Sequence, residues 1–321
     1  MGDDRTLDRW AMTGALSLGL YAVAAGWGLP ALIGQRLGAS PRVAIATWLA
    51  GCASVLVAVV LAALQLAFPD HAIGDRFAAL VAACSSLLAG HALPPTARPL
   101  TVAVGLAMVG VLVTRLCWAA VRVCWAARRG RAEHRRAVEL VGRPSRELGA
   151  LVVEHAEPAA YCVPGRRGVV VVTSGALTAL DRRQVAAVLA HERAHVDGRH
   201  HVLLTAAQVA ARVLPWVPLF KATGTAVPGL VELLADDVAA REHDSCVIAS
   251  ALIALARAST PASTLGAGGE TAVARVKRLL SPTPPPSLRD RALGALGVAW
   301  LLTAPATATL LPSLLSCPVI A

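Results

Sequence analysis

The chain has 321 residues, of which 56% are hydrophobic and only 16% are charged, and its formal net charge is +10 at pH 7. Soluble domains carry about 25% charged residues, so this composition argues against an ordinary soluble protein and favours a membrane protein. Basicity can also indicate nucleic-acid binding. The sequence has no basic stripe with interleaved aromatic residues, however, and we expect no direct contact with nucleic acid.

Four apolar stretches are long enough to cross a lipid bilayer, which takes about 20 helical residues. Residues 11–34, 43–68 and 292–321 contain no charged side chain, and residues 100–121 contain only Arg115. Because Arg115 lies toward one end of its stretch, its long side chain could reach the headgroups. The sequence therefore predicts a mainly α-helical membrane protein with about four transmembrane helices.

Three other segments are predicted from length and pattern. Residues 77–93 are apolar but short, and we expect a helix packed on the outer surface. Residues 151–153 and 169–173 are rich in valine and predict short strands, which would give the soluble part an α+β character. Residues 168–174 are a candidate edge strand for holding an extended substrate, and a plain core strand is an equal alternative.

A helix with two histidines is the most informative feature. Asp181 followed by Gln184 forms a capping-box pattern, and Gly198 is a plausible helix end, so a helix is predicted over 182–197. Within it, His191 and His195 are four residues apart and share one face, as zinc ligands require. Glu192 lies beside them, where its carboxylate can take a proton from the attacking water.

A second helix can supply the third zinc ligand. Glu232 and Asp236 are also four residues apart, in a segment with helical periodicity. Glu232 is the best candidate for the ligand, and Asp236 can accept a hydrogen bond from a liganding histidine. His200 and His201 would be alternative ligands, but we expect them at the surface or at the membrane interface.

The segment between these two helices, 202–220, is long enough to span but contains polar residues and two prolines. We predict a buried or interfacial hairpin, because a crossing segment would start the two metal-binding helices from opposite sides of the membrane.

Arginine distribution predicts the orientation, since cytoplasmic loops carry the excess of Lys and Arg. The loop 69–99 is nearly balanced, whereas arginines cluster at the other ends of the spans: Arg36, Arg42, Arg128, Arg129, Arg131, Arg135, Arg136, Arg289 and Arg291. We therefore expect a plasma-membrane protein with an N-terminal membrane region (1–127), a cytoplasmic zinc-protease domain (128–290) and a C-terminal span (291–321).

Residues 161–241 resemble the membrane metallopeptidases of the BlaR/MecR type, which are antibiotic-sensing signal transducers. The matching pieces are YCVPG (161–165), VVVVTSGAL (169–177), AHERAH (190–195) and ELLADD (232–237). The resemblance implies a zincin-like fold, the zinc ligands His191, His195 and Glu232, the general base Glu192, and a transcriptional repressor as substrate. Few residues follow the last span, so we expect a short form without the penicillin-binding sensor domain.

The sequence leaves alternatives open. HtpX-type and CAAX-prenyl membrane proteases share the E-x-x-A-D pattern, and an HtpX-like quality-control protease is one alternative. A non-catalytic membrane signalling scaffold is another, although the intact Glu192 argues for an enzyme. Arg278, Arg275 and His243 are candidates for stabilising the oxyanion, and the two arginines could equally face lipid headgroups.

Overall fold

The computed structural model describes residues 4–35, 40–68, 99–165, 168–258, 267–281 and 287–315. Over these residues the protein is mostly helical (81%) and has one small mixed sheet. Its elements, in chain order, are α1 (Asp4–Gln35), α2 (Pro41–Ala67), α4 (Pro99–Val141), β1 (Arg143–Ser145), β2 (Ala150–Val153), β3 (Ala160–Val163), β4 (Val169–Thr173), α5 (Ser174–Ala179), α6 (Arg182–Asp197), α7 (His200–Val213), α8 (Pro218–Ala239), α9 (Ser245–Ala258), α10 (Ala267–Leu280) and α11 (Leu288–Leu315).

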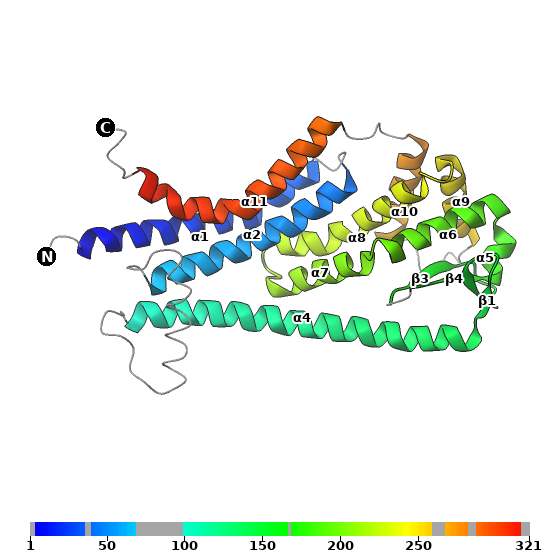
Figure 1. Ribbon diagram of the computed structural model, residues 1–321, viewed down its shortest axis with the longest axis horizontal. Coiled ribbons are helices and arrows are strands. Elements are labelled where there is room, and N and C mark those ends of the chain that lie inside the picture. The colour runs from blue at the N-terminus through cyan, green and yellow to red at the C-terminus, as the bar shows by residue number, and fades with distance from the viewer. Residues whose placement is uncertain are drawn as a thin grey trace.

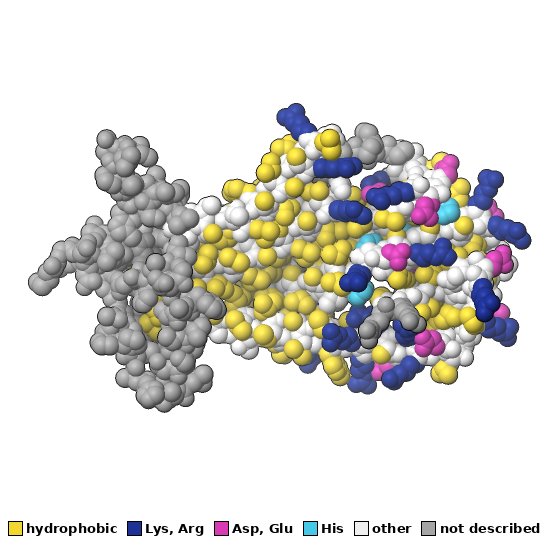
Figure 2. Space-filling view, in the orientation of Figure 1, with side chains coloured by type: hydrophobic (Ala, Val, Ile, Leu, Met, Phe, Trp, Pro, Cys, Tyr) yellow, Lys and Arg dark blue, Asp and Glu magenta, His cyan; other side chains and the backbone are white. Residues whose placement is uncertain are grey.

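The helices α1, α2, α4 and α11 are long and apolar enough to cross a membrane, which confirms the predicted fold class. They lie together as a bundle, and the sheet with α5, α6, α9 and α10 gathers at one end of it (Figure 1). Hydrophobic side chains cover the visible face of the bundle, whereas Lys and Arg gather toward the end that carries the sheet (Figure 2). The helix predicted over 77–93 lies outside the described residues.

One of these helices is much longer than the stretch that predicted it. The helix α4 has 43 residues and continues from the bundle along the sheet (Figure 1). Val138, in its last turns, packs in one cluster with Val163 and Val171 of the sheet. The helix α4 therefore connects the bundle rigidly to one face of the sheet.

The sheet has the strand order β1-β2-β4-β3, in which β2 and β4 are parallel and the outer pairs are antiparallel. The strands predicted at 151–153 and 169–173 are present as β2 and β4. The prediction that residues 168–174 form an edge strand is wrong, because β4 pairs with β2 on one side and with β3 on the other. Strands buried on both faces are typically continuous apolar runs, which explains why the valine-rich β4 lies in the interior of the sheet and β3 at its edge.

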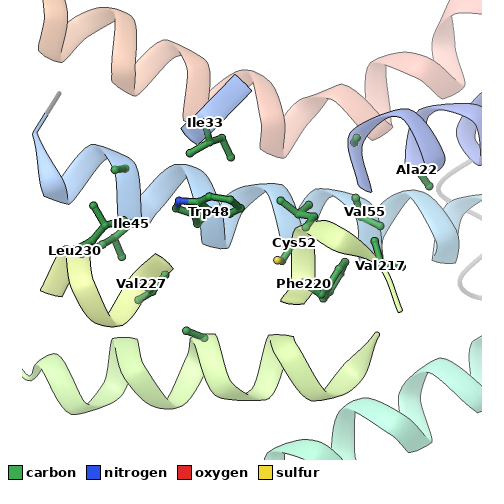
Figure 3. Close-up of a cluster of buried hydrophobic side chains, with 14 of the residues drawn as sticks. Ala22, Ile33, Ile45, Trp48, Cys52, Val55, Val217, Phe220, Val227 and Leu230 are labelled. Carbon is green, nitrogen blue, oxygen red and sulfur yellow. The ribbon is translucent and has the colours of Figure 1, made fainter. Parts of the chain in front are cut away.

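The segment 202–220, predicted as a buried or interfacial hairpin, forms most of α7 and the turn into α8. The α7–α8 hairpin is buried as predicted, but its second arm is the metal-binding helix α8 itself. Its turn lies among the spans: a Cβ added to Gly26 of α1 would come within 2.8 Å of Val217 Cγ1. The Cys52 sulfur of α2 lies 3.2 Å from the Thr223 hydroxyl of α8. Figure 3 shows Phe220 and other α8 side chains facing α2. The hairpin therefore enters the bundle and returns to the end that carries the sheet.

Arg115 of α4 binds this turn. Its Nε donates a hydrogen bond to the Val213 carbonyl over 2.8 Å, and its guanidinium lies 4.6 Å from the centre of the Trp216 ring. Its place near the end of the span would also have allowed it to reach the headgroups, and the structure shows it inside the bundle. The last carbonyls of a helix have no partner within that helix, so the end of α7 offers Arg115 an acceptor inside the bundle.

Candidate metal centre

The helix α6 has the bounds that the sequence signals predicted. The Asp181 side chain accepts from the Gln184 backbone N–H, and the Gln184 side chain accepts from the Asp181 backbone N–H, which completes the capping box. Gly198 is the C-cap. Val185 and Leu189 pack against the sheet, and this packing fixes the rotation of α6 about its axis and so the direction of its two histidines.

The side chains of His191, His195 and Glu232 converge. The Nε2 atoms of the two histidines are 3.1 Å apart, and the Glu232 carboxylate oxygens lie 3.4 Å from His191 Nε2 and 3.5 Å from His195 Nε2. Ligands at about 2.0–2.1 Å from a tetrahedral zinc ion are about 3.4 Å from one another. Two imidazole nitrogens and a carboxylate at these separations therefore fit zinc.

Asp236 and Arg275 lie behind this cluster. Asp236 is 1% exposed, and its Oδ1 lies 2.9 Å from Nδ1 of His191. Arg275 of α10 donates to both Asp236 oxygens over 2.8 Å, and its Nη1 lies 3.1 Å from Glu232 Oε2. Burial raises the pKa of Asp236, but hydrogen bonds from Arg275 and His191 outweigh it and lower that pKa to about 2. Asp236 is therefore ionised at neutral pH and can hold the proton of His191 on Nδ1.

Glu192 is half-buried beside the cluster. Burial raises the pKa of its carboxyl to about 7, and the carboxylate accepts a backbone hydrogen bond from Cys162. A general base is most effective when its pKa lies near the working pH. Cys162 belongs to β3, so the edge strand of the sheet runs past the candidate base.

The three candidates for stabilising the oxyanion lie in different places. Arg275 is in the site, with its Nη2 3.4 Å from His191 Nε2, and its guanidinium is shared between Glu232 and Asp236. Arg278 Nη1 lies 2.6 Å from Asp237 Oδ1, and this ion pair joins α10 to α8. His243 lies in the turn that follows α8. Arg275 is thus the candidate that the fold brings to the cluster.

His200 was expected at the surface or at the membrane interface, and this expectation is wrong. It is 3% exposed, and its Nδ1 lies 3.0 Å from Nδ1 of His195. Burial lowers the pKa of His195 to about 4 and lowers that of His200 as well, so both rings are neutral at pH 7. Helical periodicity did not reveal this contact, because a turn separates α6 from α7.

The comparisons with known proteins bear on the same region. Residues 126–264 match the family model described as Peptidase family M48. The matched stretch covers less than half of the chain; it includes the histidines, Glu192 and Glu232 but ends before Arg275. No curated protein and no solved structure matches the chain. With the four apolar helices, the match supports a membrane metallopeptidase of the zincin type in general, not the BlaR/MecR type in particular.

Proposed function

We propose that this protein is an integral-membrane, zinc-dependent endopeptidase, with His191, His195 and Glu232 as zinc ligands and Glu192 as general base. The observation that carries the proposal is the convergence of three ligand atoms, at separations that suit tetrahedral zinc, beside a carboxyl whose pKa is about 7. The family match to residues 126–264 supports the same reaction class.

The residues divide the chemistry among them. Zinc held by the three ligands would supply Lewis acidity to the scissile carbonyl and to a water molecule. Glu192 takes a proton from the attacking water and passes it to the leaving amine. Asp236 keeps the proton of His191 on Nδ1, which leaves Nε2 free to bind metal. Arg275 balances the negative charge of Glu232 and Asp236.

The edge strand β3 is the best place for the substrate. Among the described residues β3 pairs only with β4, and its Cys162 contributes the backbone hydrogen bond to Glu192. An extended peptide that pairs with a free strand edge is held by backbone hydrogen bonds whatever its sequence. A protein segment lying along β3 would present a peptide bond close to Glu192, and the neighbouring bundle favours substrates at the membrane.

We place the catalytic part, 128–290, on the cytoplasmic side of the plasma membrane, between the membrane regions 1–127 and 291–321. The arginine distribution supports this orientation. It would give the enzyme access to a cytoplasmic regulatory protein, such as the repressor that the BlaR/MecR resemblance suggests.

The test of the proposal is Glu192→Gln. The variant should keep zinc and membrane insertion but lose cleavage by about 10²–10⁴-fold, the usual contribution of a general base. Glu133→Gln, at an exposed glutamate paired with Arg129 on α4, is the matched control. The readout is zinc analysis together with a comparison of protein termini in cells that express each form.

The same comparison separates the alternatives. One protein that accumulates uncut in Glu192→Gln cells indicates a regulatory protease, whereas many damaged membrane proteins indicate an HtpX-like quality-control role. Equal processing in Glu192→Gln and wild type would contradict the enzyme and favour a non-catalytic scaffold.

A further inference from the structure

The two histidines of α6 have different partners on the side away from Glu232. His191 faces a carboxylate, that of Asp236, across 2.9 Å. His195 faces another imidazole, with the Nδ1 atoms of His195 and His200 3.0 Å apart and the two rings nearly perpendicular at 85°. His200 is almost fully buried, so its ring is held against His195.

The backbone between α6 and α7 is shaped for this contact. Arg199 has φ 48° and ψ 39°, and among the described residues it is the one non-glycine residue with positive φ. Such a left-handed conformation is costly for a residue with a side chain and persists only where the surroundings enforce it. At Gly198, a Cβ would lie 2.5 Å from Nε2 of His200, so this position has no room for a side chain. The turn thus folds His200 back onto His195.

The contact between the two Nδ1 atoms limits how the rings can pair. When their Nδ1 atoms are in hydrogen-bond contact, one must carry the proton and the other must accept it. His195 can bind a metal through Nε2 only if its own proton is on Nδ1. The Nδ1–H of His195 then donates to the Nδ1 of His200, and His200 carries its proton on Nε2.

We infer that His200 is a positioning residue for the metal centre, which accepts the Nδ1–H of His195 and so directs Nε2 of His195 toward the metal. This inference rests on the proposed zinc site. It gives the α7–α8 hairpin two connections to the centre, because α7 begins at His200 and α8 carries Glu232. The partner of His195 is an imidazole, whereas the partner of His191 is the carboxylate of Asp236.

The test uses the full-length protein in detergent, stripped of metal and then titrated with zinc or with cobalt. His200→Leu removes the acceptor, and its zinc affinity should fall by about 10–100-fold, as is typical when the partner of a liganding histidine is lost. The visible absorption of the cobalt form should also change. His200→Asn places an amide oxygen near the position of Nδ1, so its affinity and spectrum should stay close to those of wild type.

His201→Leu is the matched control, because it alters the neighbouring histidine without touching His195. An unchanged zinc affinity in His200→Leu would overturn the inference, and so would an equal loss in His200→Asn and His200→Leu, since packing alone would then explain it. A wild-type chain that takes up no zinc overturns the proposed function along with the inference. A wild type that binds zinc as tightly as His200→Leu overturns only the role of His200.

Discussion

The two helices that form the candidate metal centre are held in place by different parts of the molecule. The helix α6 packs on the sheet through Val185 and Leu189. The helix α8 packs for most of its length among α1 and α2, and Phe220 near its beginning is fully buried there. Half of the site thus belongs to the part that contains the sheet, and the other half to a hairpin packed into the helix bundle.

This difference shows how the site depends on the bundle. Glu232 meets the two histidines only if α8 is held at one position along its axis. Many of the contacts that hold α8 lie several turns away among the spans, in addition to those beside Glu232 itself. Packed interiors transmit small shifts and do not absorb them. We therefore expect changes within the bundle to reach the metal centre through α8.

The largest loss of zinc affinity is expected from a change at the candidate ligand Glu232, in the last turns of α8. Glu232→Ala should lower zinc affinity at least as much as the loss of a histidine partner does, which is about 10–100-fold. The control is Asp237→Ala, five residues along the same helix, where the carboxylate pairs with Arg278 instead. Zinc content after dialysis against a chelator is the measurement. Undiminished zinc in Glu232→Ala would show that Glu232 is not a ligand, and α8 would then not supply one.

A smaller loss of zinc affinity is expected from a change near the beginning of α8, at Phe220. Phe220→Ala leaves a cavity among the spans, and such a change costs about 3–5 kcal/mol in well-packed interiors. Because Phe220 and Glu232 share one helix, zinc affinity should fall along with the midpoint of thermal unfolding. Both are measured in detergent, with zinc titrated well below the unfolding temperature.

Leu189→Ala on α6 is the companion variant, since Leu189 is buried against the sheet. It should lower stability by about 2–5 kcal/mol and should also displace the histidines. If Phe220→Ala unfolds earlier but binds zinc as wild type does, the membrane half of α8 does not position Glu232, and the comparison between the two helices fails.

The same comparison explains what the sequence could predict. The helix α6 was predictable to the residue because its capping box, apolar stripe and terminal glycine all lie within 18 residues, 181–198. The spans were predictable because their signal is a long run without charge. Helical spacing predicted that His191 and His195 share one face of α6, and their Nε2 atoms lie 3.1 Å apart. Glu232 was named because zinc needs a third ligand, and the packing of α8 brings it within 3.4–3.5 Å of the two rings.

Contacts between elements were not predictable in this way. Arg275 is 39 residues from Asp236 in the chain, and only the packing of α10 against α8 brings them together. The sequence could therefore name Arg275 as one of three candidates but could not rank it. Strand order is also a property of the whole sheet, which is why the sequence could not decide whether residues 168–174 form an edge strand or the core strand that β4 is. His200 was misplaced because Arg199 reverses the chain in an unusual conformation.

The smallest effect on stability and zinc affinity is expected from removing the N-cap of α6, one of the local signals that made this helix predictable. Asp181→Ala removes the N-cap hydrogen bond to Gln184 and should cost about 1 kcal/mol of stability. Asp181→Asn keeps an acceptor at the same position and should stay near wild type, because Asn and Asp cap helices about equally well.

Zinc affinity should hardly change in either variant, since the histidines lie in the last two turns of α6 and are held by the sheet, by Asp236 and by His200. Thermal unfolding and zinc titration on the two variants check this together. A loss of zinc affinity in Asp181→Ala as large as that in Phe220→Ala would mean that α6 depends on its cap as much as α8 depends on the bundle, and the two halves of the site would then be equally sensitive.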